Sequence, residues 1–88
     1  MKLNPTHFDK ADGRAHGHAD RFTIYHTFLL TQRERDTLDA DQRIDRAQQR
    51  AAKFGGRFYN GGDHESLIVF KTRDLPTLCY QLNEEIGE

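Results

Sequence analysis

The sequence has little of what marks extracellular, membrane or cofactor-binding proteins. It contains one cysteine and two prolines among 88 residues, and only 35% of its residues are hydrophobic. The single cysteine, Cys79, excludes an internal disulfide framework and favours a reducing, cytoplasmic setting. No apolar run is long enough to cross a bilayer, and residues 2–20 are too polar for a signal peptide. We therefore expect a cytoplasmic protein without membrane contact.

A strong net charge is also absent, because the formal net charge is -1. The charges are unevenly distributed: residues 21–60 carry eight basic and five acidic side chains, and residues 61–88 carry two basic and six acidic ones. This layout fits neither a polyanion mimic nor the broadly basic profile of a typical DNA-binding domain. The phosphate-binding patterns GxxxxGK[ST] and GxGxxG are missing as well. We predict neither an enzyme nor a bound cofactor.

The clearest structural signal lies in the stretch 39–56. Its apolar side chains follow steps of 4, 3, 4 and 3 residues, which places them on one side of an α-helix: Ala40, Ile44, Ala47, Ala51 and Phe54. Asp39 and Gln42 have the spacing of a reciprocal capping pair, and Gly55-Gly56 predicts the left-handed end of the helix. This amphipathic helix must lie on an apolar surface.

The other segments predict strands and a second helix around this one. Residues 21–31 are rich in β-branched and aromatic side chains and predict a strand. After the central helix come a short strand at 57–60 and a strand at 65–72 that is apolar on both sides. Asp74-Leu75-Pro76 marks the start of the second helix. The apolar stripe of that helix comprises Leu75, Leu78, Cys79, Leu82 and Ile86.

The order β-α-β-β-α predicts one small α+β domain over residues 21–88. We expect a three-stranded sheet with both helices on one face, which is the architecture of half a ferredoxin-like sandwich. Residues 1–20 have no clean period and are predicted to precede the domain as an irregular N-terminal arm. A chain of 88 residues has no room for a second core.

A row of basic side chains follows one edge of the central helix. Arg43, Arg46, Arg50 and Lys53 are separated by 3, 4 and 3 residues, and Arg57 extends the row beyond the helix end. We call these five residues the helix stripe. Three of its helical members, from Arg46 onward, have no acidic residue one turn away. The stripe has three interpretations: a solvated face, ion pairs with the C-terminal acids, or a surface for an anionic or acidic partner. The C-terminal acids are Glu84, Glu85 and Glu88.

The predicted sheet presents a second candidate surface, because helices on one side leave its other side uncovered. The alternation of side chains along 21–31 places Tyr25 and Leu29 on that side, and Tyr59 joins them from the next strand. Such a face suits RNA bases, a second copy of the chain or another protein. Alternatively, the N-terminal arm folds over it with Leu3 and Phe8 as anchors.

The segment His16-Gly17-His18-Ala19-Asp20 has the order H-x-H-x-D. It resembles the start of the zinc motif of metallo-β-lactamase-fold hydrolases. The resemblance implies His16 and His18 as zinc ligands and Asp20 as a ligand of a second site. It ends after these residues, because that motif continues with histidine where this chain has Arg21.

The leading hypothesis is a non-enzymatic protein-interaction module that docks on a larger protein or nucleoprotein complex. A virus- or plasmid-encoded inhibitor or regulator of a host complex, for example a defence system, would have this size and lack of motifs. The predicted contact residues are the helix stripe, Tyr25 and Tyr59. The alternatives are self-association through the open sheet face, binding of RNA or single-stranded nucleic acid by the same residues, and a metal-dependent activity at His16, His18 and Asp20.

Overall fold

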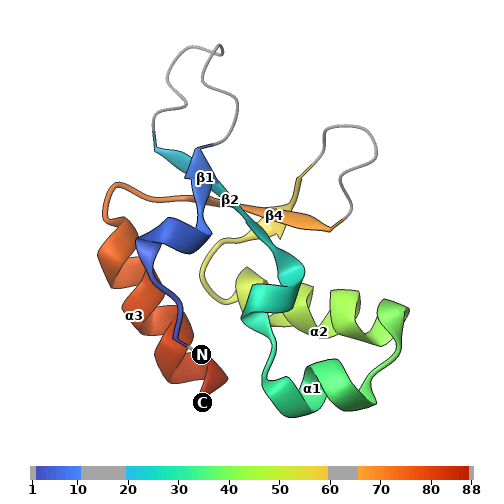
Figure 1. The fold of residues 1–88 in the computed structure, drawn as a ribbon. Helices are drawn as coiled ribbons and strands as arrows, with labels where there is room; N and C mark the ends of the chain where they lie inside the picture. The colour runs from blue at the N-terminus through green and yellow to red at the C-terminus, as the bar shows by residue number, and fades with distance from the viewer. Residues whose placement is uncertain (1, 11–19, 60–65, 88) are drawn as a thin grey trace.

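The computed structural model of the chain describes residues 2–10, 20–59 and 66–87. Four strands form one antiparallel sheet in these ranges: β1 (Asp9–Lys10), β2 (Arg21–Tyr25), β3 (Arg57–Phe58) and β4 (Leu67–Lys71). Their order across the sheet is β1-β2-β4-β3 (Figure 1). The predicted α+β class is confirmed. The predicted count of three strands is wrong, because β1 comes from the predicted N-terminal arm.

Strand β1 is too short to show a pattern in the sequence. Its position is fixed by the neighbouring Phe8, which is buried and meets the ring of Phe70 edge-on, with the ring centroids 6.2 Å apart. This contact brings β1 alongside β2, with Asp9 opposite Thr23. The fourth strand therefore forms because an aromatic residue of the arm enters the core.

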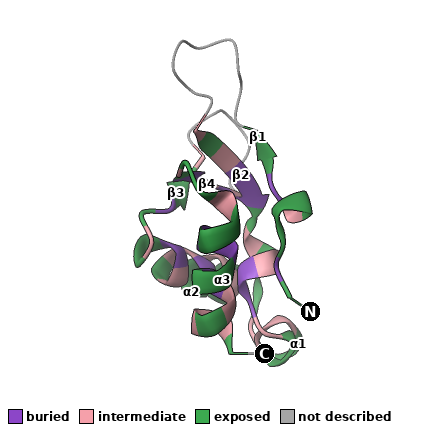
Figure 2. Cartoon of the chain, turned by 90° about the vertical axis from the view of Figure 1, so that its left-hand side faces the viewer, coloured by how far each residue is buried: buried purple, intermediate pink, exposed green. Residues whose placement is uncertain are grey.

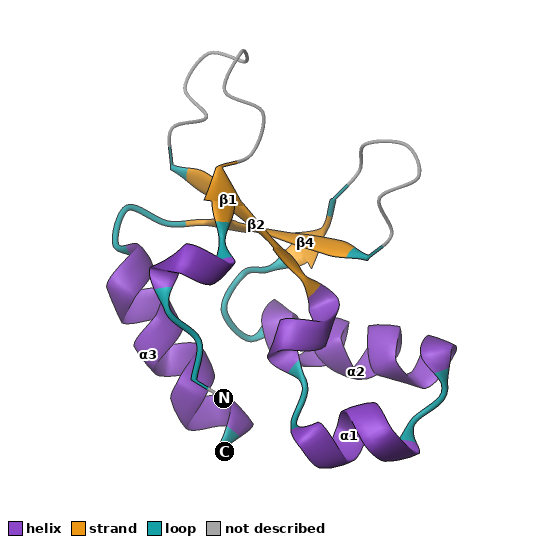
Figure 3. Ribbon diagram, viewed as in Figure 1, coloured by secondary structure: helices purple, strands orange, loops and turns teal. Residues whose placement is uncertain are grey.

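Helices form the second layer of the described fold. They are α1 (Gln32–Thr37), α2 (Ala40–Ala52) and α3 (Leu75–Ile86), and two 3-10 turns accompany them, η1 (Pro5–His7) and η2 (His26–Leu29). The three α-helices lie on one side of the sheet (Figures 1 and 3). The predicted order is kept by β2, α2, β3, β4 and α3, to which β1 and α1 are added. Half a ferredoxin-like sandwich therefore describes only part of the chain.

The hydrophobic core lies between the sheet and the helices (Figure 2). Its sheet side consists of two cross-strand pairs, Phe22 with Phe70 and Ile24 with Ile68. Its helix side is made by buried residues of α2 and α3, which are Ala47, Ala51, Leu78, Cys79 and Leu82. These residues come from the predicted apolar stripes, so the two stripes indicated the buried faces correctly.

The strand predicted over residues 21–31 ends at Tyr25, where η2 begins. The amide of His26 still donates to the carbonyl of Ser66 at 2.8 Å, and the chain then turns. Leu29 and Leu30 are consequently both buried, with 0% and 1% of their surface exposed. A 3-10 turn lacks the two-residue alternation of a strand, so neighbouring leucines can both face the core. The prediction that Leu29 belongs to the open sheet face is wrong.

Helix α2 has the predicted start, but it ends at Ala52, before the predicted members Lys53 and Phe54. Asp39 accepts a hydrogen bond from the amide of Gln42 at 2.9 Å, and the side chain of Gln42 accepts one from the amide of Asp39 at 3.1 Å. Gly55 follows the helix with a φ of 81°, in the left-handed conformation. Gly56 has a different role, because an added Cβ would lie 2.5 Å from Cε1 of Phe70. The backbone approaches the core closely at this point.

Asn83 of α3 holds the start of the chain. Its side chain accepts a hydrogen bond from the amide of Leu3 at 2.8 Å and donates one to the carbonyl of Leu3 at 2.9 Å. Leu3 and Phe8 are both buried, as expected of anchors. They enter from the helix side of the sheet, however, since Leu3 is bound to α3 and Phe8 contacts Phe70. Leu3 and Phe8 therefore do not fold over the open sheet face, and residues 11–19 lie outside the described ranges.

Candidate functional site

Glu34 of α1 neutralises two members of the helix stripe. Its carboxylate accepts hydrogen bonds from Arg50 at 2.8 and 3.2 Å and from Arg46 at 2.7 Å. Arg50 also donates to the carbonyl of Leu29, and only 13% of its side chain is exposed. Glu34 in addition accepts from the amide of Thr31 at 2.8 Å as the capping box of α1. Local spacing along α2 could not indicate this partner, because it precedes the helix.

These contacts lower the pKa of Glu34 from 4.5 to about 2. The side-chain hydrogen bond from Arg50 is the main cause; burial opposes it by raising the pKa, and the Thr31 amide, the charge of Arg50 and the hydrogen bond from Arg46 lower it further. The carboxylate therefore stays ionised at neutral pH and joins α1 to α2. Arg50 has a structural role, whatever else it does.

The other members of the helix stripe have separate positions. Lys53 forms an ion pair with Glu85 of α3, which confirms for this residue the interpretation of pairing with the C-terminal acids. Arg43 donates through Nε to the carbonyl of Leu38 at 2.9 Å. Arg57 lies in β3, away from the helical members. Contact of the stripe with a partner stays a prediction.

The sheet face turned away from the helices, which we call the open face, carries three rows of side chains. From one end to the other, the rows are Arg21 and Lys71, then Thr23, Val69 and Arg57, and last Tyr25, Leu67 and Tyr59. Tyr59 falls in the last row because its amide donates to the carbonyl of Leu67 at 2.9 Å. Along β2, the first and last rows are about 13 Å apart, at ~3.3 Å per residue. The predicted placement of Tyr25 and Tyr59 on one face agrees with this register.

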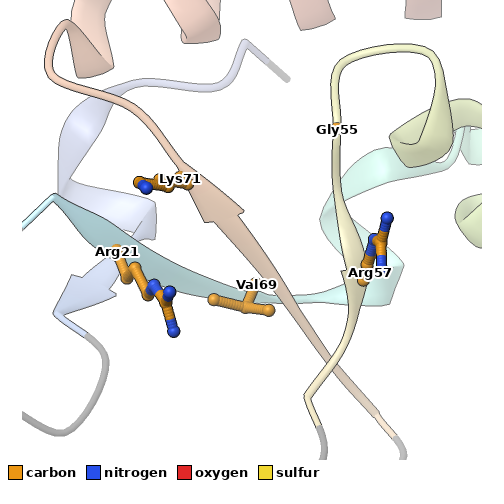
Figure 4. Close-up of a pocket in the computed structure, with 5 residues that line it drawn as sticks. All are labelled: Arg21, Gly55, Arg57, Val69 and Lys71. Carbon is orange, nitrogen blue, oxygen red and sulfur yellow. The ribbon is translucent and has the colours of Figure 1, made fainter. Parts of the chain in front are cut away.

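Three cations from adjacent strands lie in the first and middle rows of the open face. Arg21, Arg57 and Lys71, which we call the basic cluster, line a depression of about 390 Å³ together with Val69 and Gly55 (Figure 4). Gly55 has no side chain that would fill the depression. Within the described ranges, no side chain forms an ion pair or a hydrogen bond with any of the three cations.

The register places two of these cations directly opposite each other. Arg21 pairs with Lys71 across β2 and β4, and Arg57 lies opposite Val69, diagonal to Lys71. The Cβ atoms of directly opposite residues are about 4.5–5.5 Å apart, and like charges at that separation destabilise a sheet. An anion in the depression would relieve this repulsion.

Sequence reasoning missed Arg21 and Lys71 as site residues. Arg21 is four residues before Tyr25 and therefore shares its side of the strand, which was a usable signal. The partner of Arg21 was not readable, because the register between β2 and β4 joins residues 50 positions apart in the chain. Only the paired sheet shows that Arg21, Lys71 and Arg57 line the same depression.

The proposed metal cluster is only partly within the described ranges. Asp20 is described, whereas His16 and His18 lie outside these ranges. Among the described residues, no three histidine, cysteine, aspartate or glutamate side chains are grouped so that they could hold a metal ion. Metal-dependent activity stays a prediction that the described residues do not test. No helix within the described ranges is long and apolar enough to span a membrane.

The chain was compared with known proteins at the level of families, sequences and structures. No family model, no curated protein and no solved structure matches it. Inference about its function therefore rests on the geometry of its own residues. The basic cluster is the strongest candidate, because it gathers cations without a counter-charge from the described part of the fold.

Proposed function

We propose that the chain is a non-enzymatic binding module that docks on an anionic region of a larger macromolecule through the open face. The observation that carries this proposal is the contrast between two sets of cations. Arg46, Arg50 and Lys53 form ion pairs within the fold. The basic cluster has no such partner among the described residues. Cations held together without a counter-charge are suited to bind one from another molecule, and the arginine fork fits carboxylate and phosphate groups.

The basic cluster attracts anions only over a short distance. The whole chain has a formal net charge of -1, so it is not drawn to polyanions by its overall charge. In physiological salt, a charge is screened over about 8 Å. Binding must therefore depend on direct contact with the cluster, which makes it sensitive to individual substitutions.

The occupant of the open face is a different molecule rather than a second copy. Two open faces packed row on row would bring two basic clusters together, and juxtaposed like charges oppose that association. A module that covers an anionic region of a larger complex would act as a regulator or inhibitor of that complex. This role extends the leading hypothesis from the sequence. Of the two contact surfaces predicted there, it keeps the sheet face and not the α2 edge.

The proposal is tested with two defined polyanions, fluorescein-labelled polyglutamate and a labelled oligouridylate. Binding is followed by fluorescence anisotropy for the wild type, for R21Q/K71Q and for the control K2Q/R33Q. The control removes the same charge at two exposed positions away from the open face. We expect at least one polyanion to bind, and we expect only R21Q/K71Q to weaken that binding. The absence of binding to both polyanions, or equal loss in the two variants, would overturn the proposal.

A further inference from the structure

We infer that the anionic macromolecule is single-stranded nucleic acid. Its phosphates bind to the basic cluster, and its bases stack on the row of Tyr25, Leu67 and Tyr59, which we call the tyrosine row. This inference rests on the proposed function and specifies its ligand. Both halves of the surface lie on the same side of the same sheet, and β2 connects them directly, from Arg21 to Tyr25.

The charged end of the open face favours a phosphate backbone over a protein partner. Lysine is depleted throughout protein–protein interfaces. Here Lys71 lies on an inner strand, and Arg21 lies directly opposite it. The apolar residues of the middle and last rows, Val69 and Leu67, are only partly exposed and offer little hydrophobic area. Phosphates, in contrast, are held by cations in such positions.

The other end of the open face supplies an aromatic platform. Tyr25 lies on the inner strand β2, and 54% of its surface is exposed, which is a large exposed area for an aromatic residue. It lies opposite Leu67, with Tyr59 on the far side of Leu67. Stacking on aromatic side chains is how proteins bind unpaired bases without reading their sequence. RNA-binding modules with a four-stranded sheet stack two or three bases in this manner.

The spacing of the two ends suits an extended strand. Arg21 and Lys71 are separated from the tyrosine row by about 13 Å, at ~3.3 Å per residue along β2. The middle row between them holds the uncharged Thr23 and Val69, together with Arg57. A single strand can place its backbone at one end and turn its bases to the other. The bases of a duplex are already stacked on each other, so a duplex can use only the cluster.

The experiment measures binding of a labelled oligouridylate of about 12 nucleotides, a length within the usual site size of single-strand-binding folds. Titrations run from about 50 mM to about 200 mM salt, where phosphate contacts dominate the change in affinity. The proteins are the wild type, R21Q/K71Q, Y25A, Y25F and the control K2Q/R33Q. A labelled duplex of the same length and labelled polyglutamate are titrated separately for comparison. Circular dichroism of each variant verifies that it is folded.

We expect R21Q/K71Q to lower the affinity for the single strand at least tenfold. Each lost phosphate contact reduces the salt slope by about 0.7, so two lost contacts make it shallower by about 1.4. Y25A should weaken single-strand binding about fivefold or more, whereas Y25F, which keeps the ring, should bind like the wild type. Y25A should leave duplex binding unchanged, because the duplex does not use the ring.

Other outcomes separate this inference from the proposed function. Cluster-dependent binding of polyglutamate without binding of the oligonucleotide would overturn the nucleic-acid assignment and leave the anionic-partner function standing. Duplex binding as tight as single-strand binding, or an oligonucleotide affinity that Y25A does not change, would also overturn it. If neither polyanion binds, both proposals are wrong.

Discussion

Both oxygens of the Glu34 carboxylate accept hydrogen bonds from the guanidinium of Arg50, at 2.8 and 3.2 Å. Arg46 donates to the same carboxylate at 2.7 Å, and so does the amide of Thr31, the N-cap residue of α1. One carboxylate therefore connects the start of α1 with the C-terminal half of α2. The relationship explains why α2 carries arginines that have no acidic neighbours along the helix.

The two arginines should differ in their importance for stability. Arg50 has 13% of its side chain exposed and Arg46 has 47%. R50A removes the side-chain donor to the carbonyl of Leu29 and two of the hydrogen bonds to Glu34, so we expect the free energy of unfolding to fall by about 2–3 kcal/mol. R46A removes a mostly exposed ion pair and should lower it by less than about 1 kcal/mol. Urea unfolding of both variants measures the difference, and equal losses would contradict the structural role of Arg50.

Glu34 should make the stability of the fold depend on pH in acid. Its pKa in the folded state is about 2, below the ordinary value of 4.5. A lowered pKa in the folded state contributes stability that is complete above pH 4.5 and is lost as the pH falls toward 2. At 1.36 kcal/mol per pKa unit the shift corresponds to at most about 3 kcal/mol, and solvent screening of the carboxylate reduces this contribution.

The variant E34Q isolates this contribution, because glutamine keeps the capping box but carries no charge. We expect E34Q to be less stable than the wild type at neutral pH and to approach it as the pH falls from 4.5 to 2. Urea unfolding at a series of pH values in this window measures the convergence. Parallel curves for the two proteins would show that Glu34 does not have the lowered pKa.

Lys71 should oppose stability while it supports binding. It lies directly opposite Arg21 in the sheet. K71E replaces a like-charge pair with an opposite-charge pair, so the free energy of unfolding should rise by about 0.2–1 kcal/mol. The same variant should lose affinity for the oligonucleotide. K2E changes the charge equally at an exposed position before η1 and should alter neither property; a destabilised K71E would contradict the cross-strand repulsion.

The two glycines after α2 should respond differently to substitution. G56A would place a Cβ 2.5 Å from Phe70, so we expect a loss of about 1–3 kcal/mol in the free energy of unfolding. Gly55 has a φ of 81° and no atom near the position of an added Cβ. G55N should be nearly neutral, because asparagine tolerates the left-handed conformation. Thermal unfolding compares them, and a stable G56A would contradict the close approach to the core.

Short-range patterns predicted the parts of the fold that are stabilised locally. The capping pair Asp39–Gln42 and the apolar stripe of α2 lie within one helix, and so do the start and the stripe of α3. The strand at 65–72 was found because its apolar run is continuous. The misses involve partners far away in the chain: Phe8 brings β1 into the sheet, and η2 ends the first long strand because both Leu29 and Leu30 enter the core.

The candidate site divides in the same way. The tyrosines were predicted on one face from alternation, and the register places them in one row. Arg21 and Lys71 were missed, and Arg57 was assigned to the helix stripe, because residues on three strands meet only when the strands are paired. The basic row does lie along α2, but acidic partners were sought only within that helix. The acids that pair with it are Glu34 of α1 and Glu85 of α3.

The sequence by itself determined the α+β class, the two amphipathic helices and which of their faces are buried, because hydrophobic periodicity and capping act over a few residues. Only the tertiary structure decided which charges are neutralised. Glu34 meets Arg50 across 16 positions, and Arg21 meets Lys71 across 50. Electrostatic interactions depend on distance in space. Charges that look alike in the sequence therefore become internal ion pairs on α2 and, on the open face, a cluster without a counter-charge from the described residues.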